Sequence, residues 1–262
     1  MPSLAASLHD WRRAFKLASL WYNLALEDLR DRYRKTVLGT IWTVLSFALF
    51  VAVYILVFGQ RVAATKPEFA LFVTLGFGLW SYINAVTVDA CNAFLHSRAW
   101  LLGTAIPYPV FLLQAVLRNC LIFALILVVM ALALIWKPTP WSAAAWFAIP
   151  GLLAYLLTSV WLAAILAPLC ARYRDLQHAI QTGMRLLFFL TPVLWMPGGN
   201  RALGALAQWN PVTSFIEIVR APLLYNRVPL DSWAIVLVIN AIGLLLGVIV
   251  YAHTRKRVAY WV

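Results

Sequence analysis

The chain has 262 residues, of which 64% are hydrophobic and 11% are charged, and its mean hydropathy is +0.84. A soluble domain is roughly half apolar and about a quarter charged, so this composition excludes a water-soluble protein. The net charge of +12 suggests nucleic-acid binding, but the basic residues lie at the ends of apolar segments instead of lining one polar face. We therefore expect an all-α integral membrane protein that binds lipid and no nucleic acid.

The N-terminal segment, residues 1–36, has scattered charges and lacks the continuous apolar stretch of a cleavable signal. Residues 8–26 alternate aromatic residues and cations at near-helical spacing, which predicts an amphipathic helix. Such a helix can lie in the cytoplasmic interface or pack against the chain's own spans, and the pattern fits both equally. The basic run Arg30 to Lys35 directly precedes the first long apolar segment.

Six segments are long and apolar enough to cross a hydrocarbon core of about 30 Å, which needs roughly 20 helical residues. Their predicted bounds are 37–60, 69–92, 111–135, 142–169, 178–196 and 232–252. The even number places both termini on one side, and 15 of the 21 Lys and Arg residues then lie on that side. Because loops rich in Lys and Arg stay cytoplasmic, we expect both termini in the cytoplasm. One transmembrane domain would cover 1–262, with a six-span core at 37–252 and a cytoplasmic tail at 253–262.

Charged residues are scarce within these spans. Asp89 lies near the inner end of the second span, where we expect it to pair with a neighbouring arginine or cap a helix instead of transferring protons. Arg118 and Arg185 are expected near span ends. An ion-coupled carrier, which normally keeps ionisable groups at mid-membrane, is not favoured.

The segment between the fifth and sixth spans, about 197–230, is too long for a hairpin and too apolar for an exposed loop. Its prolines predict two short helices that meet near Asn210 and Pro211 and dip back into the outer leaflet as a gate. Glu217 and Arg220 lie one helical turn apart, and a solvated ion pair is favoured over a substrate contact.

Signatures of catalysis are missing from the sequence. It contains no GxxxxGK[ST] phosphate-binding loop and no GxSxG, HExxH or paired-carboxylate pattern. It also lacks CxxC motifs and His/Cys clusters, so we expect no metal, no cofactor and no disulfide scaffold. Energy for any uphill transport must come from a partner or an ion gradient.

Several short motifs follow one another along nearly the whole chain. They are Arg32-Tyr33-Arg34 before Leu38-Gly39 and Trp42, then Arg172 to Leu176, then Thr191-Pro192-Val193, then Asn210-Pro211-Val212-Thr213 followed by Arg220 and Leu223-Leu224. In this order they resemble the permease subunit of type-2 ABC exporters for cell-surface polysaccharides. The chain is most similar to permeases that export O-antigen linked to a polyprenyl carrier, with capsule and teichoic-acid exporters as close relatives.

The resemblance implies a homodimer in the bacterial inner membrane, joined to two copies of a separate ATPase subunit. Closure of the ATPase dimer would press on cytoplasmic elements of the permease and rock its two copies. The expected coupling contacts are Arg32, Tyr33, Arg34, His96, Arg98, Trp100 and Leu101. The alternatives are that the basic run only anchors the first span to headgroups and that residues 96–104 form a plain turn.

Aromatic residues make up 14% of the chain, including 13 Trp. Sugar rings stack their C–H faces on aromatic rings, and in the resembled family an aromatic-lined path is expected. The candidates for the path are Phe47, Tyr54, Phe58, Phe77, Trp80 and Trp195, and those for the outer gate are Asn210, Pro211, Glu217 and Arg220. For each single aromatic residue, a lipid-facing or interfacial position is the favoured alternative.

Two further questions stay open at this level. Gly243 and Gly247 form a GxxxG pattern that dimerisation and internal packing explain equally well. Besides polysaccharide export, the sequence allows export of small hydrophobic cargo, a membrane enzyme acting on lipid-linked glycans, or a membrane scaffold. A membrane enzyme would need acids or histidines clustered near one leaflet, and no such cluster is visible in the sequence.

Overall fold

The structure is a computed structural model that describes residues 4–34, 36–62, 68–136, 142–197 and 201–262. Lys35 of the basic run and residues 198–200 of the predicted gate segment lie outside this description. Within the described ranges all regular elements are helical, which confirms the all-α class. The helices are α1 Leu4–Lys16, α2 Ala18–Tyr33, α3 Ile41–Val62, α4 Phe69–His96, α5 Arg98–Gly103, α6 Pro109–Trp136, η1 Ala143–Phe147, α7 Ala148–Arg172, α8 Arg174–Leu190, α9 Arg201–Trp209, α10 Pro211–Tyr225, α11 Leu230–Thr254 and α12 Val258–Trp261.

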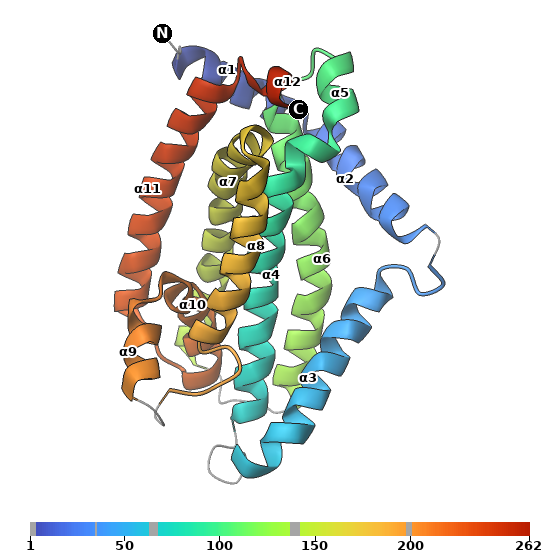
Figure 1. The fold of residues 1–262 in the computed structure, drawn as a ribbon. Helices are drawn as coiled ribbons and strands as arrows, with labels where there is room; N and C mark the ends of the chain where they lie inside the picture. Colours follow the sequence, from blue (N-terminus) through green and yellow to red (C-terminus); the bar gives the residue numbers. More distant parts are fainter. Residues whose placement is uncertain (1–3, 35, 63–67, 137–141, 198–200) are drawn as a thin grey trace.

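Five of the six predicted spans coincide with helical segments long and apolar enough to cross a membrane. These segments are Ile41–Gly59, Phe69–Gly103, Pro109–Trp136, Ala143–Arg172 and Leu230–Thr254. The remaining predicted span, 178–196, begins within α8, which ends at Leu190. With 17 residues α8 is about 25 Å long, and its first turns are polar, so it does not read as an ordinary apolar span. It nevertheless runs beside α4 within the bundle (Figure 1).

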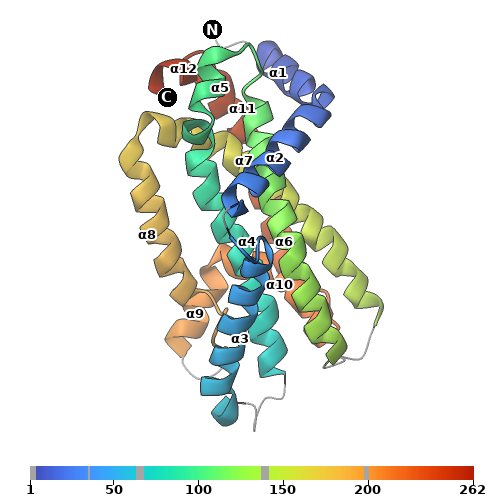
Figure 2. The ribbon, with the colours of Figure 1, turned by 90° about the vertical axis from the view of Figure 1, so that its right-hand side faces the viewer.

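The long helix α4 forms the centre of the bundle, packed against α6 and α7, while α11 packs on the other side of α7. Both chain termini lie at one end of the bundle, together with α1, α5 and α12 (Figure 1). We call this the terminal end. The short helices α9 and α10 lie toward the opposite end (Figures 1 and 2). α3 starts apart from the other helices and approaches α4 and α6 toward its end (Figure 1).

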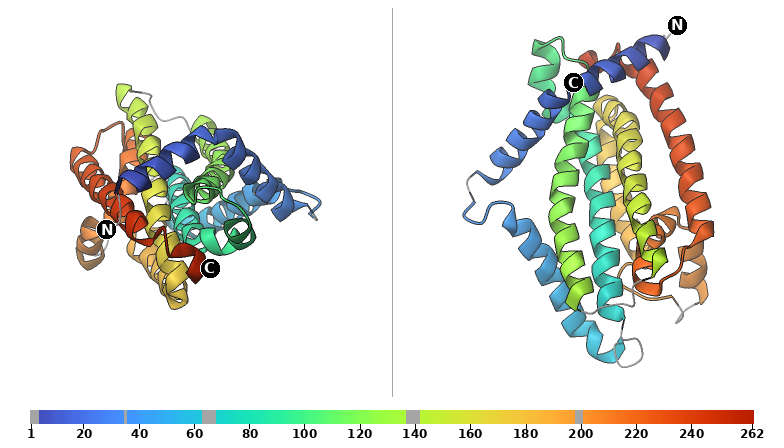
Figure 3. Two further views of the ribbon diagram at one scale, coloured as in Figure 1. Left: turned by 90° about the horizontal axis from the view of Figure 1, so that it is seen from above. Right: turned by 180° about the vertical axis from the view of Figure 1, so that it is seen from behind.

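The N-terminal region contains two helices where the sequence predicts one. Leu17 interrupts the helical backbone, and the indole nitrogen of Trp21 donates back to the carbonyl oxygen of Ala14 over 3.2 Å. α1 crosses α11 at the terminal end, and α2 descends across α6 (Figure 3). Both N-terminal helices therefore pack against spans of the same chain. Leu8 and Phe15 of α1 remain exposed, so α1 also presents apolar side chains to a membrane surface.

The turn between α2 and α3 explains the Leu38-Gly39 motif. Gly39 has φ +56°, a backbone conformation that residues with a Cβ rarely adopt. The Tyr33 hydroxyl lies 2.7 Å from the Thr43 hydroxyl and ties the end of α2 to the start of α3.

The GxxxG pattern of α11 serves packing inside the chain. A Cβ at Gly243 would overlap the indole ring of Trp161 on α7, and Gly247 lies against Trp161 and Ala164. The same helix pair is joined by the Asn240 side-chain oxygen, which accepts hydrogen bonds from Trp161 Nε1 over 2.9 Å and from Thr158 Oγ1 over 3.0 Å. Close helix approach through small residues therefore holds α7 and α11 together.

Candidate functional site

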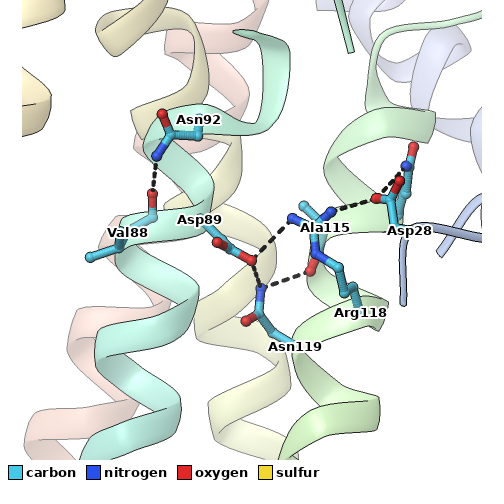
Figure 4. Close-up of polar contacts among 8 residues, drawn as sticks. Asp28, Val88, Asp89, Asn92, Ala115, Arg118 and Asn119 are labelled. Carbon is cyan, nitrogen blue, oxygen red and sulfur yellow. Dashed lines mark hydrogen bonds and ion pairs between the residues drawn. The ribbon is translucent and has the colours of Figure 1, made fainter. Parts of the chain in front are cut away.

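A buried arginine links the N-terminal helix to the centre of the bundle. Arg118 donates from Nη2 to Asp89 Oδ2 over 3.0 Å and from Nη1 to Asp28 Oδ2, so one side chain on α6 joins α4 and α2 (Figure 4). Gln114 donates to Asp28 over 2.8 Å and Asn119 donates to Asp89 over 3.0 Å. We call these five residues the Arg118 cluster.

The Arg118 cluster settles two of the sequence expectations. The predicted pairing of Asp89 with an arginine is confirmed. The expected place of Arg118 near a span end is wrong, because it is the tenth residue of the 28-residue α6 and its side chain is only 7% exposed. Asp28 was not recognised from the sequence, since it lies 90 residues before Arg118 on a helix outside the apolar spans.

A polar cavity of about 410 Å³ opens beside this cluster, between α2, α4, α5 and α6. Two buried atoms on its wall, Gln114 Oε1 and Arg118 Nε, have no hydrogen-bond partner among the described residues. The acids and histidine that line the cavity are Glu27, Asp28, Asp31 and His96. The three acids come from α2, and α4 adds the histidine to the same cavity.

Helix α5 forms a separate ledge at the terminal end (Figure 1). Leu101 is buried with 5% exposure and anchors α5, whereas Trp100 and Leu102 are 51% and 56% exposed. His96 and Arg98 are exposed as well. The ledge therefore presents an aromatic and an apolar side chain to any protein that approaches this end.

The predicted coupling residues fall into two groups that the structure does not bring together. Arg32 and Arg34 are exposed at the far end of α2, which slopes away from α5 (Figures 1 and 3). Tyr33 lies between them and contacts Thr43 of α3. An earlier part of α2 lies nearer to α5: Asp28 and Asp31 line the same polar cavity as Trp100 of α5.

Most of the predicted path residues form one continuous aromatic array over α3, α4 and α8. On α3 the ring of Phe50 lies 4.3 Å from Phe77 of α4 between centroids, and Tyr54 lies 4.6 Å from Phe58. On the α8 side, Phe188 lies 5.5 Å from Trp80 and 6.2 Å from Phe77. The rings of the array are Phe47, Phe50, Tyr54, Phe58, Phe69, Phe77, Trp80, Phe188 and Phe189, of which Phe47, Phe69 and Trp80 are buried.

Four members of the array, Phe50, Phe69, Phe188 and Phe189, were not predicted from the sequence, and one predicted residue lies outside it. Phe50 lies three residues after Phe47 and four before Tyr54, so helical spacing pointed to it. Phe188 had no such signal, because its contacts to α4 are made across the bundle. Trp195 is absent from the array's ring contacts and instead donates its indole N–H to the carbonyl oxygen of Phe189 over 3.1 Å.

At the opposite end from the termini, two of the sequence motifs contact each other. Asn210 caps α10 by accepting from the Val212 N–H over 3.0 Å, and Pro211 occupies the first turn, where its missing N–H is harmless. The Asn210 amide also donates to Thr191 Oγ1 over 2.7 Å. The two short helices thus meet at Asn210 and Pro211 as predicted.

Arg220 is fully buried and fastens α10 to two other segments. Its guanidinium donates to the Pro192 carbonyl oxygen over 2.7 Å and to Glu217 Oε1 over 2.5 Å, and lies 3.7 Å from the centre of the Phe72 ring. The expected solvated pair is therefore wrong: Glu217 and Arg220 do pair, but inside the protein. A Cβ at Gly76 would lie 3.0 Å from Arg220 Nη1 and 3.1 Å from the Val193 carbonyl oxygen, so a larger residue there would crowd Arg220.

No arrangement of three or more His, Cys, Asp or Glu side chains suited to a metal ion occurs in the described ranges.

Comparison with known proteins places these features in a family. The model of the ABC-2 type transporter family matches residues 20–224. The chain is 28% identical to the O-antigen export system permease protein RfbA of Myxococcus xanthus over 222 residues, covering 83% of this chain and 85% of that protein. Two proteins of the same name from Klebsiella pneumoniae are each 22% identical over 236 residues, covering 89% of this chain and 91% of theirs.

Proposed function

Because the chain belongs to the ABC-2 type transporter family, we propose that it is the permease of an ATP-driven exporter that moves lipid-linked O-antigen polysaccharide across the bacterial inner membrane. The related proteins are named as O-antigen export permeases and align over most of their length with this chain. The single structural observation that carries the cargo class is the aromatic array. Its exposed rings, such as Phe50 and Phe58, offer a polymer repeated sugar contacts and no deep binding site, while Phe47 and Trp80 are buried in the core.

In this proposal residues 1–262 form one permease domain, two copies of which assemble around a path. The terminal end faces the cytoplasm, where two copies of a separate ATPase subunit bind. The basic composition of that end supports this orientation. The short helices α9 and α10 form the re-entrant outer gate, with Arg220 and Asn210 as its anchors. Capsular polysaccharide and teichoic acid remain alternative cargoes of the same chemistry.

The function is tested by deleting the gene in its host and measuring lipid-linked polymer inside the cell and polymer at the surface. Export predicts that surface polymer disappears while lipid-linked polymer accumulates inside, and that the wild-type gene restores both. A catalytically inactive partner ATPase should give the same result. Loss of polymer in both places would instead indicate synthesis, and unchanged surface polymer would exclude polysaccharide export.

We expect the α5 ledge to carry contacts to the ATPase. Replacing Trp100 by alanine should reduce cargo-dependent ATP hydrolysis several-fold without lowering the amount of folded permease, because this half-exposed ring supports little of the core. Leu101→Ala is the matched comparison, since the buried Leu101 should lower stability instead, by about 2–5 kcal/mol. ATPase rates and thermal stability of the purified complexes separate the two effects. Normal coupling in Trp100→Ala would remove the ledge from the interface.

A further inference from the structure

The outward face of α8 carries a polar stripe. Arg174, His178, Gln181 and Arg185 recur at helical spacings of four, three and four residues, which places them along one line of the helix. Three of them are exposed and Gln181 is half-buried. The opposite face, with Ile180, Met184 and Leu187, packs into the core. We call the first four residues the α8 stripe.

The α8 stripe runs deep into the bundle. Arg185 is the twelfth residue of α8 and lies about 16 Å along the helix from Arg174. α8 runs beside α4, one of the spans (Figures 1 and 2). An arginine side chain is too short to bring its charge back to the start of α8 from that depth. A cation on this face is disfavoured next to hydrocarbon, so the face meets water or protein.

The acids of this chain do not provide a counter-ion at that depth. Each acid beyond the first turn of a long span or in α10 already has a partner, Asp89 with Arg118 and Glu217 with Arg220. The other acids lie in α1, in α2, at the first turn of α8 or next to the start of a span. Arg185 has no ion pair among the described residues, and in a homodimer the second copy would bring the same set of acids. A facing copy therefore cannot neutralise it at mid-depth.

The α8 stripe leads directly into the aromatic array. Phe188 follows Arg185 by one helical turn and contacts Trp80 and Phe77 of α4. Charged and polar side chains thus border the rings that would carry the glycan. An oxyanion that travels with the glycan would meet Arg185 at the edge of the stacking surface.

We propose that the α8 stripe faces a water-filled path and that Arg185 binds an oxyanion of the cargo, either the phosphate that joins the glycan to its lipid carrier or a carboxylate within the glycan. This inference rests on the proposed function for the identity of the cargo. The water exposure of the stripe does not depend on the cargo and is tested separately.

The first experiment measures water access and local charge. Thr182→Cys, one turn before Arg185, is placed in a full-length permease–ATPase complex in lipid nanodiscs, with Cys91→Ala, Cys120→Ser and Cys170→Ala removing the native thiols. Anionic sulfonatoethyl and cationic trimethylammonioethyl methanethiosulfonates are the probes. Leu245→Cys on α11 is the control, because Leu245 is 63% exposed on an apolar surface.

We expect the thiol at position 182 to react at least tenfold faster than the thiol at position 245. A unit charge about 6 Å away in water changes each reagent's local concentration roughly threefold, in opposite directions. Arg185→Gln should therefore lower the anionic-to-cationic rate ratio at position 182 by roughly tenfold. Equal, slow labelling at both positions would overturn the water-filled path, and an unchanged ratio would overturn the role of Arg185.

The second experiment measures cargo. At equal protein level, Arg185→Gln should reduce surface polymer several-fold, while Arg185→Lys, which keeps the charge, should retain at least half of it. The loss should occur with uncharged and with acidic glycans if the anion is the carrier phosphate, and only with acidic glycans if it is a sugar carboxylate. Normal export by Arg185→Gln with both glycans would overturn anion binding. Failure of the wild-type chain to support any export would instead contradict the proposed function and leave the labelling result standing.

Discussion

Replacing Arg118 by methionine should lower the free energy of unfolding by about 3 kcal/mol, because it leaves the partly buried carboxylates of Asp89 and Asp28 without their counter-ion. Asp89 accounts for most of this loss, since its side chain is 16% exposed. Asp28 is 34% exposed, so water compensates part of its loss and we place the effect at the lower end of the usual range. Thermal unfolding of the purified protein in one detergent gives the measurement.

A second substitution separates the charge from the packing. In Arg118→Met with Asp89→Asn, the unpaired charge is removed and the amide keeps a polar contact with Asn119, so about half of the lost stability should return. Arg174→Met is the matched control, because Arg174 is exposed at the start of α8 and forms no ion pair within the described chain. If Arg118→Met unfolds at the wild-type temperature, the Arg118 cluster does not hold α2 to the bundle.

Replacing Arg220 by leucine should abolish export and destabilise the protein by about 3–5 kcal/mol. The change removes the hydrogen bond to the Pro192 carbonyl and leaves Glu217 buried beside an apolar side chain. It also removes the contact with the Phe72 ring, which a desolvated guanidinium makes favourable. Surface polymer and thermal stability are measured together on the same variant.

The conservative change at this position is informative. Arg220→Lys keeps the charge but cannot reach Pro192 and Glu217 while lying flat on Phe72, so we expect it to recover less than half of the stability. Arg227→Leu is the control, because Arg227 is exposed and contacts only the Tyr225 ring among the interactions described. Wild-type export by Arg220→Leu would show that α10 does not need this anchor.

The sequence predicted most spans correctly because apolar composition alone decides whether a helix can cross a membrane. It was less successful with α8, whose first half is polar on one face and whose place in the bundle depends on contacts with α4. Mean hydropathy averages over all faces of a helix, so it did not reveal that the polar residues of α8, including Arg185, lie on one face. Arg185 was expected near a span end, and it is the twelfth of the 17 residues of α8.

The site was predictable where its residues share a helix and unpredictable where they meet across the bundle. Phe47, Tyr54 and Phe58 follow α3 spacing and were found together. The motifs around Thr191 and Asn210 were recognised as separate sequence motifs. Only the structure shows that these two side chains form a hydrogen bond with each other. The partner of Asp28 likewise became visible only when α2 was placed against α6.

The wide sequence separation within the Arg118 cluster has a consequence for how the protein is made. Asp28 leaves the ribosome 90 residues before Arg118, and synthesis proceeds at about 5–20 residues per second. For roughly 5–20 s, therefore, the newborn α2 carries a carboxylate without its counter-ion, which keeps that helix in water at the membrane surface. α2 can form its ion pair with Arg118 only after α6 has been synthesised and inserted. The two alternatives for this helix, binding at the membrane surface and packing against the spans, are therefore successive stages of assembly.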